Sequence, residues 1–221
     1  MNLKSLYNFC KEKNCPYVWT MISHLYYKLR YRLNMVVSNS VSMVRAENIQ
    51  MNGGRLEVGF IGPEFVMKEE PTLLYCLGNL YTSGNVRINK GSRICVTPQG
   101  HLSLNNCFIN SNVRILCEHE ISIGEGTSIG WGTQIVDDNY HVITYANNKK
   151  IAESQDLRAG GGVNIGKNVL ITNHCYIYRG VTIADGCVVA SNSVLKKSFT
   201  KPNMLIAGNP ACEIKEIKGW K

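Results

Sequence analysis

Residues 163–195 read VNIGKNVLITNHCYIYRGVTIADGCVVASNSVL. An aliphatic residue recurs at every sixth position of this stretch without a slip: Ile165, Ile171, Ile177, Ile183, Val189 and Leu195. Two positions before each of these stands another apolar or small residue: Val163, Val169, Cys175, Val181, Cys187 and Ser193. Glycine, asparagine and aspartate, which favour turns, lie between the pairs. The stretch is therefore a series of six-residue units, each half strand-like and half turn-like.

The period of six predicts the fold class. It is neither the 3.6-residue period of a helix nor the alternation of a half-buried strand. It is the period of a parallel β-helix, in which each hexapeptide supplies one strand and one turn and stacked coils pair edge to edge. We therefore expect a mainly β protein whose core is built from the recurring aliphatic residues.

The repeat continues upstream of residue 163 in a less regular form. After Ile121 the register slips by two residues and resumes at Ile123. Such a slip is tolerated at the corner of a coil. We expect the β-helix to span residues 35–200, with an irregular first part and a bulging loop at residues 63–71.

Residues 137–162 interrupt the repeat. This stretch, DDNYHVITYANNKKIAESQDLRAGGG, is polar, has no hexapeptide signal and ends in three glycines. We expect it to leave the coil as a long loop. Long loops between regular elements are commonly functional, so this excursion is the first place to look for a site.

The two ends of the chain lack the repeat. Residues 1–34 are expected to form a helical segment, in which one apolar face is marked by four residues: Val18, Ile22, Leu25 and Leu29. Two interpretations of this helix stay open. The helix packs on the body of the protein or on a neighbouring subunit, or it rests on an anionic membrane through its basic and aromatic residues. Residues 201–221 are expected to form a C-terminal tail with a short helix.

The net charge of +8 is concentrated at the ends. Residues 1–34 carry six lysines and arginines against one glutamate, and residues 195–221 carry six lysines against two glutamates. The middle of the chain is close to neutral, which argues against a continuous nucleic-acid track. No zinc-finger spacing or arginine-rich run supports nucleic-acid binding either.

The cysteine pattern and the hydropathy predict the compartment. The 9 cysteines are odd in number and show no paired spacing, which favours a reducing environment. We find no signal peptide and no apolar run of membrane-spanning length. We expect a cytoplasmic protein, held at the inner face of the membrane if the second interpretation of the helix holds.

Two motifs outside the regular repeat carry a resemblance to a known family. The sequence AGNPA at residues 207–211 follows the last hexapeptides, and IVDDNYH at residues 135–141 has the form D-x-[ND]-x-H directly before the loop. With the repeat, these motifs resemble the hexapeptide-repeat acyltransferases, which include sugar O- and N-acetyltransferases. The resemblance implies a left-handed coil, acetyl-CoA as acyl donor, no metal, and a homotrimer with the site between neighbouring subunits.

Acyl transfer to a hydroxyl needs a base for the proton of the acceptor, and histidine titrates near neutrality. Among the histidines, His141 alone stands at the start of the repeat-free loop beside two carboxylates. We expect it to be the general base, and the resemblance selects Asp137 as the carboxylate that orients it. Asn139 and Tyr140 are expected to contact the acceptor. The alternative is an ordinary loop histidine among turn residues.

Two other histidines are weaker candidates. His119 lies between Glu118 and Glu120, but no second cluster stands at a ligand spacing that would complete a metal site. His174 lies on the regular coil next to Asn173. We interpret His174 as structural, with a cofactor contact as the alternative.

The resemblance also implies which residues meet the cofactor. Asn173 and Ser191, 18 residues apart and therefore one coil apart, would contact the pantetheine arm of coenzyme A. Lys196 and Lys197 would lie toward its phosphates; the alternative is a solvated basic tail. The sequence departs from the family pattern at Thr172, where the family has glycine, and this bulkier residue bears on how deeply the cofactor binds.

These observations favour an acetyl-CoA-dependent O-acetyltransferase that acts on a sugar of a polysaccharide or glycan precursor. An N-acetyltransferase acting on an amino sugar and a non-catalytic β-helix scaffold stay open as alternatives. A zinc carbonic anhydrase on the same fold would need an H-x4-H pair, which the chain lacks.

Overall fold

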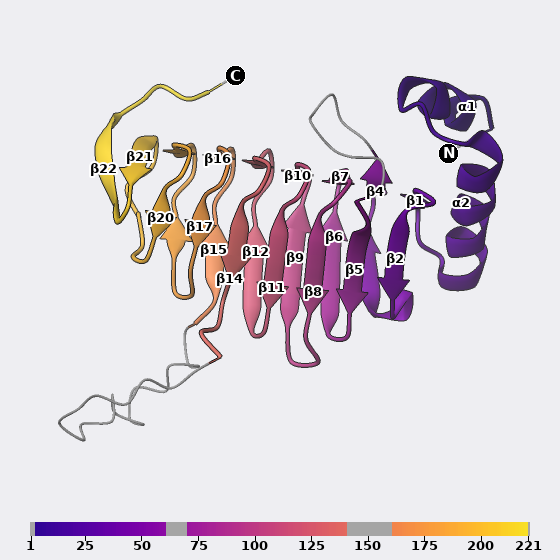
Figure 1. Ribbon diagram of the computed structural model, residues 1–221, viewed down its shortest axis with the longest axis horizontal. Helices are drawn as coiled ribbons and strands as arrows, with labels where there is room; N and C mark the ends of the chain where they lie inside the picture. Colours follow the sequence, from indigo (N-terminus) through magenta and orange to yellow (C-terminus); the bar gives the residue numbers. More distant parts are fainter. Residues whose placement is uncertain (1–2, 61–69, 141–160, 221) are drawn as a thin grey trace.

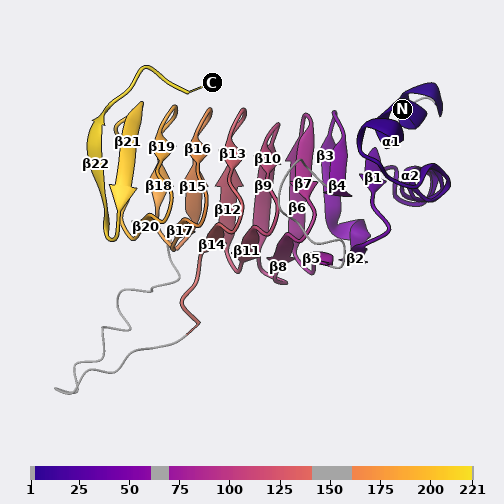
Figure 2. The same ribbon diagram turned by 45° about the horizontal axis from the view of Figure 1, so that its top comes forward.

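The computed structural model describes residues 3–60, 70–140 and 161–220. In these residues the chain forms a three-sided, left-handed parallel β-helix, whose coils stack along the long axis of the molecule (Figure 1). Two helices stand at one end of the stack and a hairpin at the other (Figure 2). The fold class expected from the period of six is confirmed.

Three sheets form the sides of the coil. The first sheet contains β1 (Met35–Val37), β4 (Leu56–Phe60), β7 (Val86–Asn89), β10 (Phe108–Ile109), β13 (Ser128–Ile129), β16 (Leu170–Ile171), β19 (Val188–Val189), β21 (Met204–Gly208) and β22 (Ala211–Glu216). The second contains β2 (Val41–Val44), β5 (Thr72–Cys76), β8 (Arg93–Val96), β11 (Arg114–Cys117), β14 (Gln134–Val136), β17 (Tyr176–Ile177) and β20 (Val194–Leu195). The third contains β3 (Ile49–Asn52), β6 (Asn79–Ser83), β9 (His101–Asn105), β12 (Glu120–Ile123), β15 (Val163–Ile165) and β18 (Thr182–Ile183). A short 3₁₀ turn, Ala46–Asn48, precedes β3.

The length of the coil changes along the stack. In the first sheet Ile109 pairs with Ile88, 21 residues earlier, and with Ile129, 20 residues later. Near the C-terminal end Ile171 pairs with Val189, which is 18 residues later and so three hexapeptides away. The late coils are therefore perfect repeats, and the earlier ones carry extra residues.

The two extra residues that cause the slip lie at a corner, as expected, but this corner precedes Ile121, because Ile121 and Ile123 belong to one strand, β12. Ile121 of β12 follows Ile115 of β11 by six positions. In the late coil the equivalent residues are Ile177 of β17 and Val181, which are only four positions apart. The turn between the second and third sheets is thus two residues longer in the earlier coil. It contains Glu118 and His119, which lie beside the start of the excursion.

A corner of the coil is held in left-handed backbone conformation. Before the strands of the first sheet, glycine and asparagine alternate with positive φ from coil to coil: Gly84, Asn106, Gly126, Asn168, Gly186 and Asn203. These two residue types tolerate that conformation best. A Cβ on Gly126 would lie 2.2 Å from Oδ1 of Asn168, so the asparagine side chain occupies the space that the glycine leaves.

The N-terminal segment forms α1 (Leu3–Glu12) and α2 (Tyr17–Tyr31). Helix α2 packs on β1, the first strand of its sheet, with Tyr27 and Tyr31 against the core and two polar side chains bonded to the strand. Ser23 Oγ donates to the carbonyl oxygen of Val37 at 3.1 Å, and His24 Nδ1 donates to that of Met35 at 2.7 Å. These bonds satisfy carbonyl groups near the open edge of the sheet, which is otherwise prone to pair with other chains.

The apolar face of α2 does not pack on the body of the chain. Its buried residues are the polar Thr20, Ser23 and His24, whereas Ile22 is 53% exposed and Leu29 is 81% exposed. The first interpretation is therefore confirmed for the helix, which packs on β1, but this packing uses the side of the helix opposite the apolar face. The described residues contain no helix long and apolar enough to cross a membrane.

The short helix expected in the C-terminal tail is wrong. Residues 204–216 form a hairpin in which β22 runs antiparallel to β21. The turn at residues 208–210 reverses the chain, and Ala211 is buried against the last coil. Backbone pairing with the open edge of β21 is available to this segment and covers the end of the stack, which an isolated helix would leave open.

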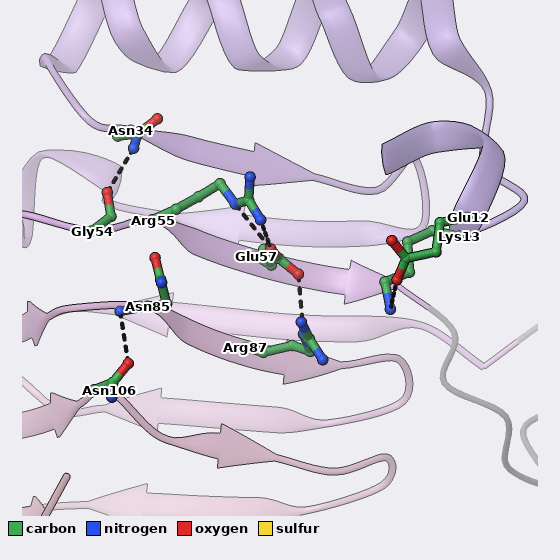
Figure 3. A network of polar contacts seen from close by, with 9 residues as sticks. All are labelled: Glu12, Lys13, Asn34, Gly54, Arg55, Glu57, Asn85, Arg87 and Asn106. Carbon is green, nitrogen blue, oxygen red and sulfur yellow. Dashed lines mark hydrogen bonds and ion pairs between the residues drawn. The ribbon is translucent and has the colours of Figure 1, made fainter. Parts of the chain in front are cut away.

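A polar network holds the first coils together on the outer face of the first sheet (Figure 3). The carboxylate of Glu57, only 4% exposed, forms ion pairs with Arg55 and with Arg87, the latter at 3.1 Å. Glu57 and Arg87 are direct partners on adjacent strands. Such opposite-charge pairs stabilise neighbouring strands. The bulging loop expected at residues 63–71 falls, except for its last two residues, outside the described residues.

Protonation of His24 should weaken the docking of α2. Burial lowers the pKa of this imidazole from its ordinary value of 6.5, and its bond to Met35 opposes that shift in part. The unfolded chain therefore binds the proton more readily, so stability falls as the pH drops below 6.5 toward the folded pKa. We expect the melting temperature of the wild type to fall more between pH 7 and about 5 than that of His24→Asn, which keeps a donor without titrating. Equal losses in the two proteins would contradict this account.

Candidate functional site

The excursion leaves the coil at a corner built around Asp137. This residue follows β14 directly and is fully buried. Its Oδ1 accepts the backbone N–H of Glu118 at 2.7 Å, and its Oδ2 accepts that of His119 at 2.9 Å. Hydrogen bonds to a carboxylate are among the stronger ones in proteins. The first residue of the excursion is thus held firmly on the preceding coil.

The donors to Asp137 come from the long corner of that preceding coil. Glu118 and His119 belong to the turn that is two residues longer than the corresponding late turn. This turn therefore presents two successive backbone N–H groups to the carboxylate. The register slip and the Asp–His motif, which are separate features of the sequence, form one structure at this corner.

A second Asp–His contact lies beside the first. His119 Nε2 is 2.8 Å from Oδ2 of Asp138, and Oδ1 of Asp138 accepts the backbone N–H of Tyr140 at 2.5 Å. Sequence reasoning missed this pair because His119 and Asp138 are 19 residues apart. That separation is close to one coil of this part of the stack, and this was the available signal.

Asn139 and Tyr140, the residues expected to contact the acceptor, are both exposed. The backbone of Tyr140 is left-handed, with φ of 58°. Although the side chain is exposed, partial desolvation of the ring, followed by the negative charges of Glu118, Asp137 and Asp138, raises the pKa of the Tyr140 phenol above its ordinary value. The hydroxyl therefore stays protonated near neutral pH and can donate a hydrogen bond.

His141, the expected base, lies outside the described residues, as do residues 142–160. The described part of the site therefore ends one residue before it. The contact between His141 and Asp137 stays a prediction. The last described residue before His141, Tyr140, is exposed, and the carboxylates of Glu118, Asp137 and Asp138 act on it electrostatically.

The four residues expected to meet the cofactor flank the same two strands. Asn173 lies in the turn before β17 and Ser191 in the turn before β20, and the backbone N–H of Asn192 donates to the carbonyl oxygen of Asn173. Lys196 and Lys197 follow β20 directly. Asn173 and Ser191 are thus neighbours on successive coils, and the lysines lie at the opposite ends of the strands.

The lysines lie on the same corner as the excursion. Ile135, Ile177 and Leu195 are paired across the second sheet, and the next residues along the chain are Val136, Tyr178 and Lys196. Lys196 is therefore two coils from the start of the excursion, a distance of about 10 Å at 4.8 Å per strand.

The side chains at these positions suit an anionic cofactor with an amide-containing arm. Lys196 and Lys197 are exposed, and no carboxylate of the described residues forms an ion pair with them. Lys201, by contrast, is paired with Glu216 at 3.2 Å. Unpaired lysines bind phosphate groups well, and the amide of Asn173 and hydroxyl of Ser191 can serve an amide-bearing chain.

Thr172, the departure from the family pattern, is tied into the coil. Its hydroxyl donates to the carbonyl oxygen of Val189 at 2.8 Å and accepts the Ser191 hydroxyl at 3.0 Å. Ser191 is therefore positioned by the residue that replaces the family's glycine. The residues present fit coenzyme A at this position.

His174 stands away from the excursion, at the corner between the first and second sheets. Its backbone is left-handed, with φ of 54°, like that of Asn112 and Asn192 at the same corner. A Cβ on Gly132 would lie 2.4 Å from Nδ1 of His174, so the histidine ring occupies the space that the glycine leaves. This placement supports a structural role. Among the described residues, no group of three or more His, Cys, Asp or Glu side chains could hold a metal ion.

Comparison with known proteins identifies the repeat. The family described as bacterial transferase hexapeptide (six repeats) matches residues 162–197. Over 217 residues the chain is 34% identical to an uncharacterized 24.8 kDa protein in the cps region of Klebsiella pneumoniae, covering 98% of this chain and 94% of the relative. It is 30% identical to the galactoside O-acetyltransferase of Escherichia coli K12 over 128 residues, which are 51% of this chain and 62% of the enzyme. The alignment thus spans about three fifths of that characterised relative.

A solved structure agrees in fold. The crystal structure of the polySia-specific acetyltransferase NeuO is 20% identical and has a TM-score of 0.50, with 83% of this chain and 90% of that chain covered. At this level of identity the similarity concerns the fold alone.

Replacing Asp137 should loosen the corner. In Asp137→Asn one of the two backbone N–H groups would face an amide N–H₂ instead of an oxygen, and a buried donor without an acceptor costs about 1–3 kcal/mol. We expect the free energy of unfolding to fall by about that amount in denaturant titrations. The matched control is Asp185→Asn, because exposed Asp185 accepts one corner N–H, that of Lys167 at 2.7 Å. An equal or larger loss in the control would show that Asp137 has no special role in this corner.

Proposed function

The chain belongs to the hexapeptide-repeat acyltransferases, and we propose that it transfers an acetyl group from acetyl-CoA to a sugar hydroxyl of a polysaccharide or glycan precursor. One observation carries the proposal: the corner at Asp137, where the chain leaves the coil with two carboxylates and an exposed tyrosine, lies two coils from unpaired lysines on the same side of the coil. The 30% identity to the galactoside O-acetyltransferase supports a hydroxyl acceptor over an amine.

His141 is the proposed general base. The bound cofactor supplies a thioester carbonyl carbon, which is attacked by the acceptor hydroxyl. His141 takes the hydroxyl proton as the new carbon–oxygen bond forms, and it returns that proton to the thiolate when the carbon–sulfur bond breaks. Because Asp137 is held by two backbone N–H groups, we assign it the role of positioning the segment that ends at His141, with its negative charge favouring the protonated imidazole.

Tyr140 and Asn139 are proposed to contact the acceptor. A phenol that stays protonated is a hydrogen-bond donor, and an asparagine amide both donates and accepts. Sugar hydroxyls offer both kinds of partner. The exposed positions of these two side chains at the corner support this assignment.

Asn173, Ser191, Lys196 and Lys197 are proposed to hold coenzyme A. The lysines attract the phosphates, and the serine and asparagine orient the pantetheine arm. All nine cysteines are free. Nine free thiols are typical of a protein in a reducing compartment, and we therefore propose that the reaction takes place in the cytoplasm.

We further propose a homotrimer that covers the outer face of the second sheet. An apolar column of half-buried side chains runs along this face, formed by four residues paired strand to strand: Tyr75, Cys95, Leu116 and Val136. The third sheet presents a mostly polar column in the same position, which includes Ser103, Ser122 and Asn164. Apolar surface favours contact with another subunit, and a three-fold ring closes without free interfaces.

Light scattering should give a mass of three chains of 24.7 kDa. Leu116→Asp should lower that mass to one chain at micromolar concentration, because a carboxylate would be buried in the interface. Ser122→Asp, on the polar face, should leave it unchanged. A monomeric wild type, or equal effects of the two variants, would contradict the proposed trimer and its face.

The base is tested by His141→Ala. We expect acetyl transfer to a galactoside, measured as thiol release from acetyl-CoA, to fall on the order of 10²–10⁴, the usual contribution of a positioned base. Coenzyme A affinity and melting temperature should hardly change, because the base meets the acceptor and His141 occupies no repeat position.

His174→Ala and His119→Ala are the controls for this experiment. His174→Ala should affect cofactor binding or stability, and turnover only through them. Near-normal turnover in His141→Ala with complete loss in His119→Ala would assign the base to the His119–Asp138 pair instead. An amino-sugar acceptor in the same assay separates O- from N-acetylation, and no turnover with any acceptor would support the scaffold alternative.

A further inference from the structure

Helix α2 carries an apolar face that is exposed among the residues the structure describes. Six of its side chains are large, apolar or aromatic, and exposed: Val18 63%, Trp19 49%, Ile22 53%, Leu25 43%, Tyr26 52% and Leu29 81%. Soluble proteins rarely leave a contiguous patch of this kind without a partner. The helix lies at the end of the molecule opposite the C-terminal hairpin, as both views show (Figures 1 and 2).

The six residues form one continuous stripe. At 3.6 residues per turn they fall within about a third of the helix circumference. The opposite side is the one that packs on β1: Thr20, Ser23 and His24 are buried there, and Tyr27 and Tyr31 pack against the core beside them. The apolar stripe therefore faces away from the protein, unlike the apolar face of a core helix.

Cations border the stripe on both sides. By the same helical geometry Lys28 lies beyond one edge and Arg30 beyond the other, and Arg32 follows the last turn. All three are exposed, and within the described residues no carboxylate forms an ion pair with any of them. An apolar stripe flanked by cations at its C-terminal end matches the surface of an anionic bilayer, where acyl chains lie beneath phosphate groups.

The aromatic residues point to the same partner. Trp19 and Tyr26 lie together at one edge of the stripe, next to Arg30. Tryptophan and tyrosine favour the boundary between acyl chains and head groups, because they combine an apolar ring with a polar tip. A second copy of the same helix fits less well, since it would bring the cations of both copies together.

We propose that α2 docks this protein on an anionic membrane, lying in the plane of the surface with its apolar stripe among the acyl chains. The proposal does not depend on acetyl transfer. It requires only the exposed stripe, the bordering cations and the polar contacts that fix the opposite side of the helix to β1.

The test uses the full-length protein and two kinds of vesicle. We expect co-sedimentation with phosphatidylcholine vesicles that contain phosphatidylglycerol, weaker binding to phosphatidylcholine alone, and a loss of the difference in about 1 M salt, where the Debye length is about 3 Å. Ile22→Ser combined with Leu29→Ser should weaken binding to the anionic vesicles by at least about tenfold, because two exposed apolar groups are removed. Folding should be unaffected, since both side chains are exposed.

The matched control is Ile214→Ser, an equally exposed isoleucine (56%) on β22, which should bind vesicles like the wild type. Trp19 fluorescence gives a second readout: vesicles should shift it to the blue, and the shift should disappear in Trp19→Phe and persist in Trp131→Phe.

The proposal is overturned if the wild type does not bind anionic vesicles, or if the double variant binds as well as the wild type. A change in oligomeric mass of the double variant with unchanged vesicle binding would assign the stripe to a contact between copies. Acetyl transfer to a soluble acceptor, measured without vesicles, should be equal in all these proteins, so failure here is distinct from failure of the proposed activity.

Discussion

Everything in this molecule depends on the return of each coil to the strand beneath it. A parallel ladder forms only if the chain comes back in register, with its aliphatic side chain directed into the same column. Ile129 pairs with Ile109 below and with Ile171 above, and all three are fully buried. The ladder does not depend on how many residues the chain uses between two paired strands. This is why the excursion between β14 and β15 is compatible with an unbroken core.

At the corners of the coil the sequence departs from the six-residue repeat, and the polar groups of the candidate site lie at one of these corners. The two additional residues of the corner before β12 place two backbone N–H groups where the carboxylate of Asp137 accepts them. A regular hexapeptide turn is two residues shorter at this point. The same insertion brings His119 within 2.8 Å of Asp138. The long corner thus anchors the excursion at its first residues, and an anchored starting point is what a base further along the segment needs for a reproducible position.

The two ends of the stack solve one problem in different ways. The first and last strands of a sheet expose unpaired backbone groups. At the C-terminal end β22 pairs with β21 and extends the sheet by one antiparallel strand. At the N-terminal end α2 covers β1 with hydrogen bonds from Ser23 and His24. Because the side of α2 that caps β1 bonds to it through polar side chains, the apolar stripe is left on the outside, and the partner proposed for it follows from that arrangement.

The sequence by itself predicted the coil and the place where its six-residue repeat is interrupted. A period of six, carried by Ile165, Ile171 and the aliphatic residues that follow them, is typical of a β-helix. The loss of that period after Asp137 predicts where the excursion begins. The family resemblance, read on the sequence, also singled out the Asp–His motif and the residues flanking β17 and β20. Helical periodicity likewise identified the apolar stripe of α2, because spacing along one helix is a local property. The helix expected in the tail was wrong, since residues 204–216 take their conformation from an edge that the rest of the stack provides.

Only the tertiary structure decided which residues meet across coils. His119 and Asp138 are 19 residues apart, and Asp137 reaches the N–H groups of Glu118 and His119 through a corner whose extra length has meaning only once the register is known. The direction in which the α2 stripe faces could not be predicted from the sequence either. Periodicity shows that a helix has two faces, but not which of them packs on the protein. The physical reason is common to both cases: local spacing follows from the backbone geometry of one segment, whereas contact between segments follows from how the chain closes on itself.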